Sequence, residues 1–292
     1  MDAEPLVTIA LPVFNGAASI GAVAESVLAQ EYENLEFLIS DNASTDATED
    51  VCRELAAADA RVRYHRQPRN VGLIDNFEWT KHHCRGSLLR WIGDSDTIHP
   101  SLVARCVELF ADDRLFLVTT QLEYLTNAGE TTTLRHDDDG ALRSDDPVAR
   151  LRTVLDLLAD NHLLVDPLYG MARVTAARRI RHDRMLRGDE VYAAKLALAG
   201  PWAHIPVILG SRHWTDPSAS DIAALLEVPR WKVPVRALLA ARAMLTAVDA
   251  TPLRGAEARR AKAAVRRFYV RRHWSTIARR GRRVRTELAR LR

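Results

Sequence analysis

The segment LRWIGDSDTIHP, residues 89–100, is an apolar run that ends in two carboxylates and a proline. Asp94 and Asp96 are two residues apart, so on an extended backbone both side chains point to the same side. Two hard oxygen ligands side by side suit Mg²⁺ or Mn²⁺ carrying a phosphate group. An isolated Asp-x-Asp is more often a solvated turn at the end of a strand. Its significance therefore depends on the sequence that leads up to it.

Three strand–helix units precede this segment. Apolar, β-branched runs predict strands over residues 7–14, 35–40, 62–65 and 87–92, and helical apolar spacing predicts helices over 18–30, 46–58 and 70–84. Such alternation predicts a parallel sheet covered by helices on both faces, with ligands at the carboxyl ends of its strands. Polar residues follow three of these strands, at Asn15, at 41–46 and at the Asp94–Asp96 pair. We therefore expect them to share one rim of the sheet.

Four segments resemble successive sequence blocks of family 2 glycosyltransferases, which have the GT-A fold. They read ALPVFNGAASI, SVLAQEYENLEFLISDNASTDAT, RNVGLIDNF and WIGDSDTIHP, and the resemblance runs from about Val7 to Trp214. It implies an α/β fold with a Rossmann-like, mostly parallel sheet flanked by helices. We expect a GT-A domain over residues 1–215, with a nucleotide-binding half at about 5–125 and an acceptor half at about 126–215. Residues 216–292 would form a helical, Arg-rich C-terminal extension.

The resemblance also implies a pocket for the nucleotide. In the family, the end of the first strand and the Asp of the second block hold the base and the ribose, which points to Pro12, Asn15 and Asp41. An Arg-Asn pair before a glycine belongs to the same pocket, which points to Arg69 and Asn70.

A metal site is implied next to this pocket. The family's Asp-x-Asp binds the ribose and the metal, which points to Asp94 and Asp96, although Thr97 stands where many members have another Asp. After a predicted strand over residues 203–209, the family often has a basic residue or a His that closes over the diphosphate or reaches the metal. This implies Arg212 as a phosphate contact and His213 as a third metal ligand.

The candidate for the catalytic base lies in the second half of the chain. The family often has Glu-Asp before a helix, with a Gly eleven positions after the Asp; Asp189 and Gly200 fit that offset, while Gly188 replaces the Glu. By resemblance Asp189 is the general base. A carboxylate in the first turn of a helix is stabilised as an anion by the free N–H groups and the helix dipole. Such a position is also common for an Asp with only a structural role, and Glu190 is the next candidate base.

The implied activity is a metal-dependent, inverting transfer of a sugar. The donor would be a nucleotide-sugar, and the acceptor a hydroxyl group of a glycan, a lipid-linked molecule or a small molecule. Mn²⁺ or Mg²⁺ would neutralise the charge on the departing diphosphate while the base takes the acceptor proton. A non-catalytic nucleotide-sugar-binding or scaffold homologue is the alternative. Nucleotidyl transfer is less favoured, because NGAASIG at residues 15–21 has neither Lys nor Arg.

The bulk composition favours a cytoplasmic enzyme. Of the 292 residues, 47% are hydrophobic, which is enough for a sizeable core. The start of the sequence shows no signal-peptide pattern, and no run of about 18 apolar residues is long enough to span a bilayer. The three cysteines lack metal-ligand spacing and are expected to be reduced thiols.

The C-terminal segment is strongly basic. Residues 254–292 contain 15 Lys and Arg against 2 Glu, a net charge of +13, so the rest of the chain carries −10. Apolar residues recur there with helical spacing: Val270, Trp274, Ile277, Val284, Leu288 and Leu291. Such a helix suits peripheral contact with an anionic membrane, here the inner face of the cell membrane, but it could equally pack its apolar stripe on the catalytic domain. Nucleic acid is not expected as a partner.

Overall fold

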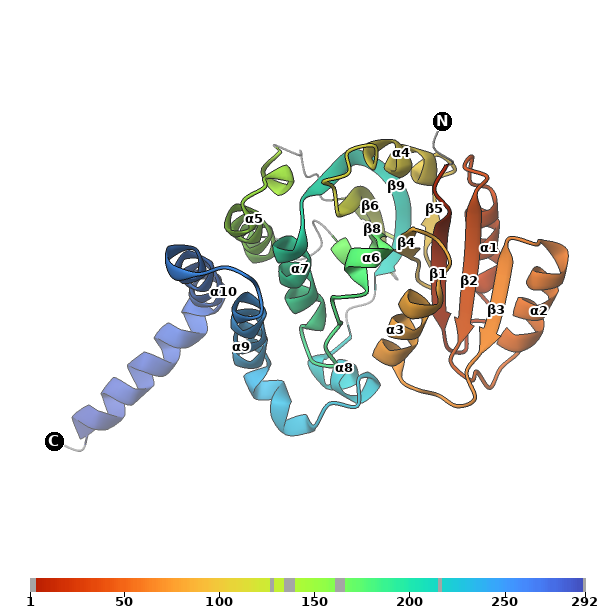
Figure 1. Ribbon diagram of the computed structural model, residues 1–292. Coiled ribbons are helices and arrows are strands. Elements are labelled where there is room, and N and C mark those ends of the chain that lie inside the picture. Colours follow the sequence, from red (N-terminus) through yellow and green to blue (C-terminus); the bar gives the residue numbers. More distant parts are fainter. Residues whose placement is uncertain (1–3, 127–128, 134–139, 161–165, 215–216, 291–292) are drawn as a thin grey trace.

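The computed structural model describes residues 4–126, 129–133, 140–160, 166–214 and 217–290. The side chains of Trp214 and of residues 274–290 lie outside the described part. The strands are β1 (Val7–Val13), β2 (Leu35–Asp41), β3 (Val62–Arg66), β4 (Leu88–Trp91), β5 (Thr97–Ile98), β6 (Leu117–Thr126), β7 (Thr131–Thr133), β8 (Met171–Arg173) and β9 (Trp202–Trp214). They form one sheet in the order β3-β2-β1-β4-β8-β6-β9-β5, with β7 paired to β6 (Figure 1).

The first half of the sheet is parallel, as predicted. β1 pairs in parallel with β2 and β4, and β2 pairs in parallel with β3. Every residue of β1 and β2 is buried, because helices cover both faces. The connecting helices are α1 (Ile20–Leu28), α2 (Thr48–Ala58) and α3 (Leu73–His83). The carboxyl ends of the four strands therefore meet at one rim, and the acidic pair follows β4.

The second half of the sheet is mixed. The short β8 inserts between β4 and β6 and is antiparallel to both, whereas the long β6 and β9 are parallel to each other. The expected strand over residues 203–209 is part of β9, which continues to Trp214. Most paired residues lie in parallel ladders, so the predicted α/β fold with a mostly parallel sheet is confirmed.

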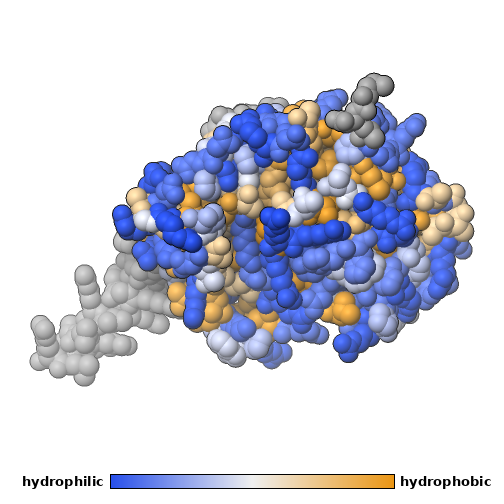
Figure 2. Space-filling model, in the orientation of Figure 1, coloured by the Kyte–Doolittle hydropathy of each residue, from blue (hydrophilic) through white to orange (hydrophobic). Residues whose placement is uncertain are grey.

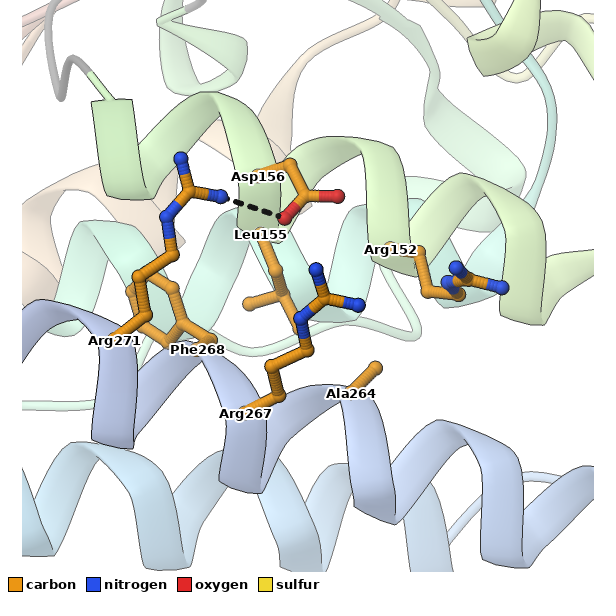
Figure 3. Close-up of a pocket in the computed structure, with 7 residues that line it drawn as sticks. All are labelled: Arg152, Leu155, Asp156, Ala264, Arg267, Phe268 and Arg271. Carbon is orange, nitrogen blue, oxygen red and sulfur yellow. Dashed lines mark hydrogen bonds and ion pairs between the residues drawn. The ribbon is translucent and has the colours of Figure 1, made fainter.

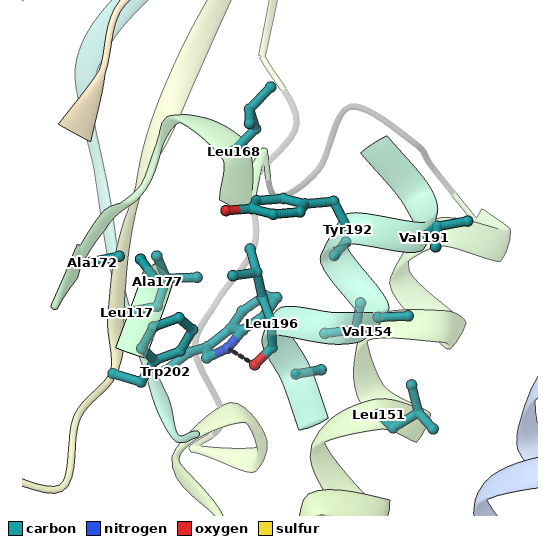
Figure 4. Close-up of a cluster of buried hydrophobic side chains, with 14 of the residues drawn as sticks. Leu117, Leu151, Val154, Leu168, Ala172, Ala177, Val191, Tyr192, Leu196 and Trp202 are labelled. Atoms are coloured by element: carbon teal, nitrogen blue, oxygen red, sulfur yellow. Dashed lines mark hydrogen bonds between the residues drawn. The ribbon is translucent and has the colours of Figure 1, made fainter. Parts of the chain in front are cut away.

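Helices cover the two faces of the sheet unequally. The remaining α-helices are α4 (Leu102–Leu109), α5 (Pro147–Asp160), α6 (Val174–Ala177), α7 (Gly188–Ala199), α8 (Ala219–Leu225), α9 (Arg236–Asp249) and α10 (Gly255–Arg290). Short 3₁₀ helices are η1 (Ala141–Arg143), η2 (Pro167–Tyr169) and η3 (Arg230–Val235). One core lies under α1, α2 and α4, and the other is shared by α3, α5, α7, α9 and α10. In the second core, the indole of Trp202 is fully buried and donates a hydrogen bond to the Leu196 carbonyl (Figure 4).

The first part of the basic C-terminal segment belongs to the domain. Ala261, Val265 and Phe268 of α10 are buried in the core that α10 shares with α5 and α9. Arg271 forms an ion pair with Asp156 of α5 beside a small pocket at this interface (Figure 3). This part of α10 therefore packs on the domain. Of the predicted stripe, Val270 is 43% exposed, and the side chains from Trp274 to Leu291 lie outside the described part.

Candidate active site

The loops after β1 and β2 are tied together by hydrogen bonds. Asn15 has a left-handed backbone with φ of 57°, which suits an Asn at the end of a strand. Its N–H donates to the Ser44 hydroxyl at 2.8 Å, and its side-chain oxygen accepts from the Thr45 N–H at 2.8 Å. The residue is exposed at the rim. Asn15 therefore sits where a ligand at the strand ends would meet it.

Asp41 lies beneath the rim and is fully buried. One carboxylate oxygen accepts from the Ser44 N–H at 2.8 Å, and the other accepts from the Tyr64 hydroxyl at 2.9 Å and from Arg66 at 2.6 Å. Burial alone would raise the pKa of Asp41, but these hydrogen bonds outweigh it and lower the pKa. In this structure the carboxylate orders the rim from below. A direct contact with a nucleotide would require one of these partners to give way.

The other residues that were predicted to bind the nucleotide differ in their exposure. Pro12 is buried within β1, opposite Ser40 of β2. Arg69 and Asn70 are exposed on the loop between β3 and α3. The Asn70 side chain accepts a hydrogen bond from Asn42 at 2.9 Å, which connects this loop to the end of β2. The structure thus brings the ends of β1, β2 and β3 into one hydrogen-bonded rim.

The acidic pair forms a tight turn after β4. The Asp96 carboxylate accepts from the Gly93 N–H at 3.0 Å, and a Cβ on Gly93 would lie only 2.8 Å from an Asp96 oxygen. A side chain at position 93 would therefore require the Asp96 carboxylate to shift. Burial and, secondarily, the charge of Asp96 raise the pKa of Asp94. Asp94 is half-buried, whereas Asp96 is only 5% exposed.

Arg212 joins the acidic pair to a residue that the sequence did not single out. Its guanidinium donates to Asp96 at 3.1 Å, forms an ion pair with Asp166 and lies 3.6 Å above the centre of the Tyr169 ring. The predicted phosphate contact is therefore engaged with two carboxylates in this structure. Asp166 lies 46 residues before Arg212, and no motif in the sequence marks it.

His213 does not join Asp94 and Asp96. Arg212 points toward Asp96, and successive residues of a strand point to opposite faces, so the next side chain along β9 is directed away from the acidic pair. His213 is exposed. Within the described residues, no group of three or more His, Cys, Asp or Glu side chains is arranged to hold a metal. The predicted three-residue ligand set is therefore not assembled, and the metal ligands available on this rim are the two carboxylates.

The predicted base stands at the start of α7 and is open to solvent. The Asp189 side chain is 78% exposed, and one of its oxygens lies 3.1 Å from the Nε2 atom of His182. His182 is buried, stacks on Tyr192 and has an Nδ1 atom with no hydrogen-bond partner among the described residues. A Cβ on Gly188 would lie 2.8 Å from the Asp183 backbone carbonyl oxygen and 3.3 Å from His182 Nε2. The glycine that replaces the family's Glu therefore lets the start of α7 pack closely on the backbone that precedes it.

Glu190, the second candidate base, is held in ion pairs. Its carboxylate contacts Arg187 at 2.9 Å and Arg272 of α10 at 3.1 Å. Arg187 has a left-handed backbone with φ of 62°, a strained conformation that turns the chain into α7. The same turn directs Asp189 outward and Glu190 inward.

The electrostatics connect the two halves of the site. Burial raises the pKa of the Asp166 carboxyl, and the Arg212 guanidinium opposes this rise. The charges of Asp189 and Asp96 both add to the rise. The Arg212 guanidinium, which contacts both Asp96 and Asp166, therefore joins the acidic pair after β4 to the segment before η2.

A parallel sheet with a polar rim and an acidic pair after its fourth strand is the arrangement of the GT-A fold. The family model for glycosyl transferase family 2 matches residues 8–162. The chain belongs to this family.

Curated relatives share only part of their sequence with this chain. It is 33% identical to a chondroitin synthase of Escherichia coli over 109 residues, which cover 37% of this chain and 16% of that protein. It is 30% identical to a hyaluronan synthase of Pasteurella multocida over 123 residues, which cover 42% of this chain and 12% of that protein. The chain thus corresponds to a small part of these longer proteins.

Solved structures match over nearly the whole chain. The S. aureus TarS 1–349 structure in complex with UDP has a TM-score of 0.66 at 12% identity and covers 92% of this chain and 72% of that one. The mannosyltransferase PcManGT from Pyrobaculum calidifontis, in complex with GDP-Man and Mn²⁺, has a TM-score of 0.55 at 17% identity and covers 94% and 84%. At these identities the similarity establishes the fold.

Proposed function

We propose that the chain transfers a sugar from a nucleotide-sugar donor to an acceptor hydroxyl, with inversion at the anomeric carbon. The observation that carries the proposal is the acidic pair after β4, where Arg212 of β9 contacts Asp96 at 3.1 Å and forms an ion pair with Asp166. It supports an acidic donor site that is built from both halves of the domain. The solved relatives' complexes with UDP and with GDP-Man support a nucleotide donor at this rim.

The donor is proposed to lie along the rim formed by Asn15, Asn70 and the Asp94–Asp96 turn. Asp94 and Asp96 would hold Mg²⁺ or Mn²⁺, since two carboxylates and the substrate's phosphates are a common ligand set for these ions. Burial raises the pKa of the half-buried Asp94 and so disfavours its ionised form. Arg212 is paired with Asp96 rather than with Asp94, so a bound cation would stabilise the Asp94 carboxylate. When bound, the metal would offset the negative charge of the leaving diphosphate.

Asp189 is proposed to remove the proton from the acceptor hydroxyl. Its exposed carboxylate has one oxygen at His182, which fixes the side chain and leaves the other oxygen toward solvent. His182 is a positioning residue in this scheme. A base on the acceptor side fits a single in-line displacement, in which the attacking oxygen approaches opposite the leaving group. The names of the chondroitin and hyaluronan synthases support a glycan acceptor; lipid-linked and small-molecule acceptors remain within the proposal.

The proposal is tested with a panel of UDP-, GDP-, dTDP- and CDP-sugars screened by thermal shift, with Mn²⁺ and with EDTA. A donor at a hundred times its Kd stabilises the protein by about 2.7 kcal/mol, so the correct one will stand out. Asp94→Asn should lose the Mn²⁺-dependent shift, whereas Asp50→Asn, on the exposed surface of α2, should keep it. No stabilisation by any nucleotide-sugar, with or without metal, would contradict the proposal.

Asp94 is a better probe of the metal than Asp96. The sequence alone predicts that Asp96 lies in an exposed turn. In the structure its carboxylate is buried and accepts hydrogen bonds from Gly93 and Arg212. Replacing it would disturb this packing as well as any metal. The Asp94→Asn variant removes the charge with less disturbance of the packing. Loss of the Mn²⁺-dependent thermal shift in this variant therefore reports on metal and donor binding.

A further inference from the structure

An apolar surface is left exposed between α8 and α9. It consists of Leu225, Trp231, Val235 and Leu238, and we refer to it as the η3 surface. Trp231 is 65% exposed, Leu225 62% and Leu238 57%. Large side chains gathered in this way on a folded protein usually mark an interaction site. Figure 2 shows hydrophobic residues at the lower rim of the molecule, over the start of α9.

The η3 surface is presented by an ordered scaffold. Val228 packs against Leu186 and Ala223, so the chain between α8 and η3 is anchored on the domain. The turn after α8 is made by Glu227, whose φ of 53° is unusual for a residue other than glycine. Inward-facing residues are thus buried while their outward-facing neighbours stay in solvent. This arrangement is not that of a loose loop.

Basic groups surround the apolar side chains. Arg230, Lys232 and Arg236 alternate with them along the chain, and the Lys232 ammonium lies 5.7 Å from the centre of the Trp231 ring. The two acidic residues of the stretch 217–238 are engaged elsewhere. Glu227 is ion-paired with Arg184 at 3.0 Å, and Asp221 forms a capping box at the start of α8. The surface is therefore apolar at its centre and positive around it.

We propose that the η3 surface docks on the headgroup layer of an anionic lipid bilayer. A Trp and two Leu side chains can enter the headgroup–acyl boundary while adjacent Arg and Lys meet lipid phosphates. A protein partner would more often require a surface with both signs of charge. Among the described residues no helix is long and apolar enough to cross a membrane. The basic α10, which follows α9 directly, adds long-range attraction to the same lipids.

The position of the η3 surface gives this docking a consequence for the reaction, which rests on the proposed function. Arg184 links Glu227, in the turn beside this surface, to Asp75 of α3, and it lies in the segment that leads into Asp189. A bilayer at the η3 surface would therefore lie on the acceptor side of the site. The chemical class of acceptor favoured by this geometry is a lipid-linked one.

The test is co-sedimentation of the full chain with phosphatidylcholine vesicles, with and without phosphatidylglycerol. The full chain should bind the anionic vesicles and keep part of this binding at high salt. The double variant Trp231→Ser, Leu238→Ser should lose the salt-resistant part, with a partition coefficient lowered about tenfold or more. The matched control is Val207→Ser, Ile208→Ser, which removes two apolar residues of β9 that are 42% and 47% exposed and should bind as the unmodified chain does.

Two further measurements keep the outcomes distinct. A chain ending at His273 should retain salt-resistant binding, because it keeps the η3 surface and loses most of the basic helix. Donor stabilisation in the thermal-shift assay reports on the proposed function separately, and the Trp231–Leu238 variant should keep it. Failure of the full chain to bind anionic vesicles, or equal binding by this variant and its control, would overturn the docking proposal. So would a light-scattering result in which the variant converts a dimer into a monomer, since the η3 surface would then be covered by a second copy.

Discussion

The nucleotide rim and the acceptor side of the site are built in contrasting ways. At the rim, Asp41 is fully buried and both of its oxygens are bonded, so the loops after β1, β2 and β3 are fixed to one another. On the proposed acceptor side, Asp189 is 78% exposed and contacts His182. The difference fits the two proposed tasks, because a donor pocket gains from being preformed whereas a base must remain open to the incoming hydroxyl.

Asp189→Asn tests the acceptor side and should have the largest effect. The amide keeps the shape of the side chain but is a poor proton acceptor, so turnover should fall about 10²–10⁴-fold. Donor affinity should stay unchanged, because the proposed donor contacts lie on the rim. The measurement is steady-state kinetics beside donor titration.

Glu190→Gln is the matched control for that variant. Glu190 is ion-paired with Arg187 and Arg272 and faces away from the site, so its loss should weaken folding more than catalysis. If Glu190→Gln removes activity and Asp189→Asn does not, the base assignment is wrong.

Arg212→Met tests whether the link between the two halves is structural. The substitution leaves the buried carboxylate of Asp96 and the half-buried carboxylate of Asp166 without their cation, and breaking a buried pair costs about 3–5 kcal/mol. Denaturant unfolding measures this loss. Arg114→Met removes an exposed ion pair with Asp112 and should have little effect. Equal stability of the two variants would show that Arg212 does not hold the halves together.

Asp41→Asn tests the rim through its pH dependence. The pKa of Asp41 in the folded protein is lowered, so its ionised form stabilises the fold above the ordinary value of 3.8, and this stabilisation is lost as pH falls through the folded-state pKa. The variant should lose about 1.5–3 kcal/mol of unfolding free energy at neutral pH, the scale of a hydrogen bond to a charged group.

The difference in unfolding free energy between Asp41→Asn and the unmodified protein should shrink when unfolding is measured at progressively lower pH, below about 4. An unchanged difference across that range would mean that the Asp41 charge does not stabilise the rim.

Removal of residues 274–292 should have the smallest effect on stability. The chain ending at His273 keeps Ala261, Val265 and Phe268 in the core, so thermal unfolding should remain close to that of the full chain. The comparison variant ends at Leu253 and removes all three, of which Val265 and Phe268 are each worth about 1.5–3 kcal/mol of burial. If the chain ending at Leu253 is as stable as the full chain, the packing of α10 contributes nothing to the fold.

The first half of the fold could be predicted because its pattern is local. Each strand of the parallel unit is a short apolar run, and each is followed by a helix with regular spacing, so the rim at Asn15, Asp41 and Asp94 followed from the order of elements. The insertion of β8 between β4 and β6 could not be predicted in this way. A three-residue strand has no period of its own, and its place depends on pairing with residues more than 50 positions away.

The candidate site divides along the same line. Asp94, Asp96 and Asp189 were predicted from motifs, whereas His182, Asp166, Arg66 and Tyr64 were not. These last residues act by contact with a side chain distant in sequence, and no local pattern marks such a contact. The structure does not bring the predicted ligand His213 to the acidic pair, since its neighbour Arg212 takes that face of β9.

By itself the sequence determined the family, the order of the strand–helix units and the residue types at the strand ends, since these depend on hydrophobic periodicity and on short motifs. The tertiary structure decided which carboxylates are free to act. It buries Asp41 beside Arg66 and pairs Asp96 with Arg212. It also directs Glu190 into ion pairs and leaves Asp189 exposed beside His182. It also decided that α10 begins inside the core. The physical reason is that burial and pairing are set by surroundings assembled from distant parts of the chain.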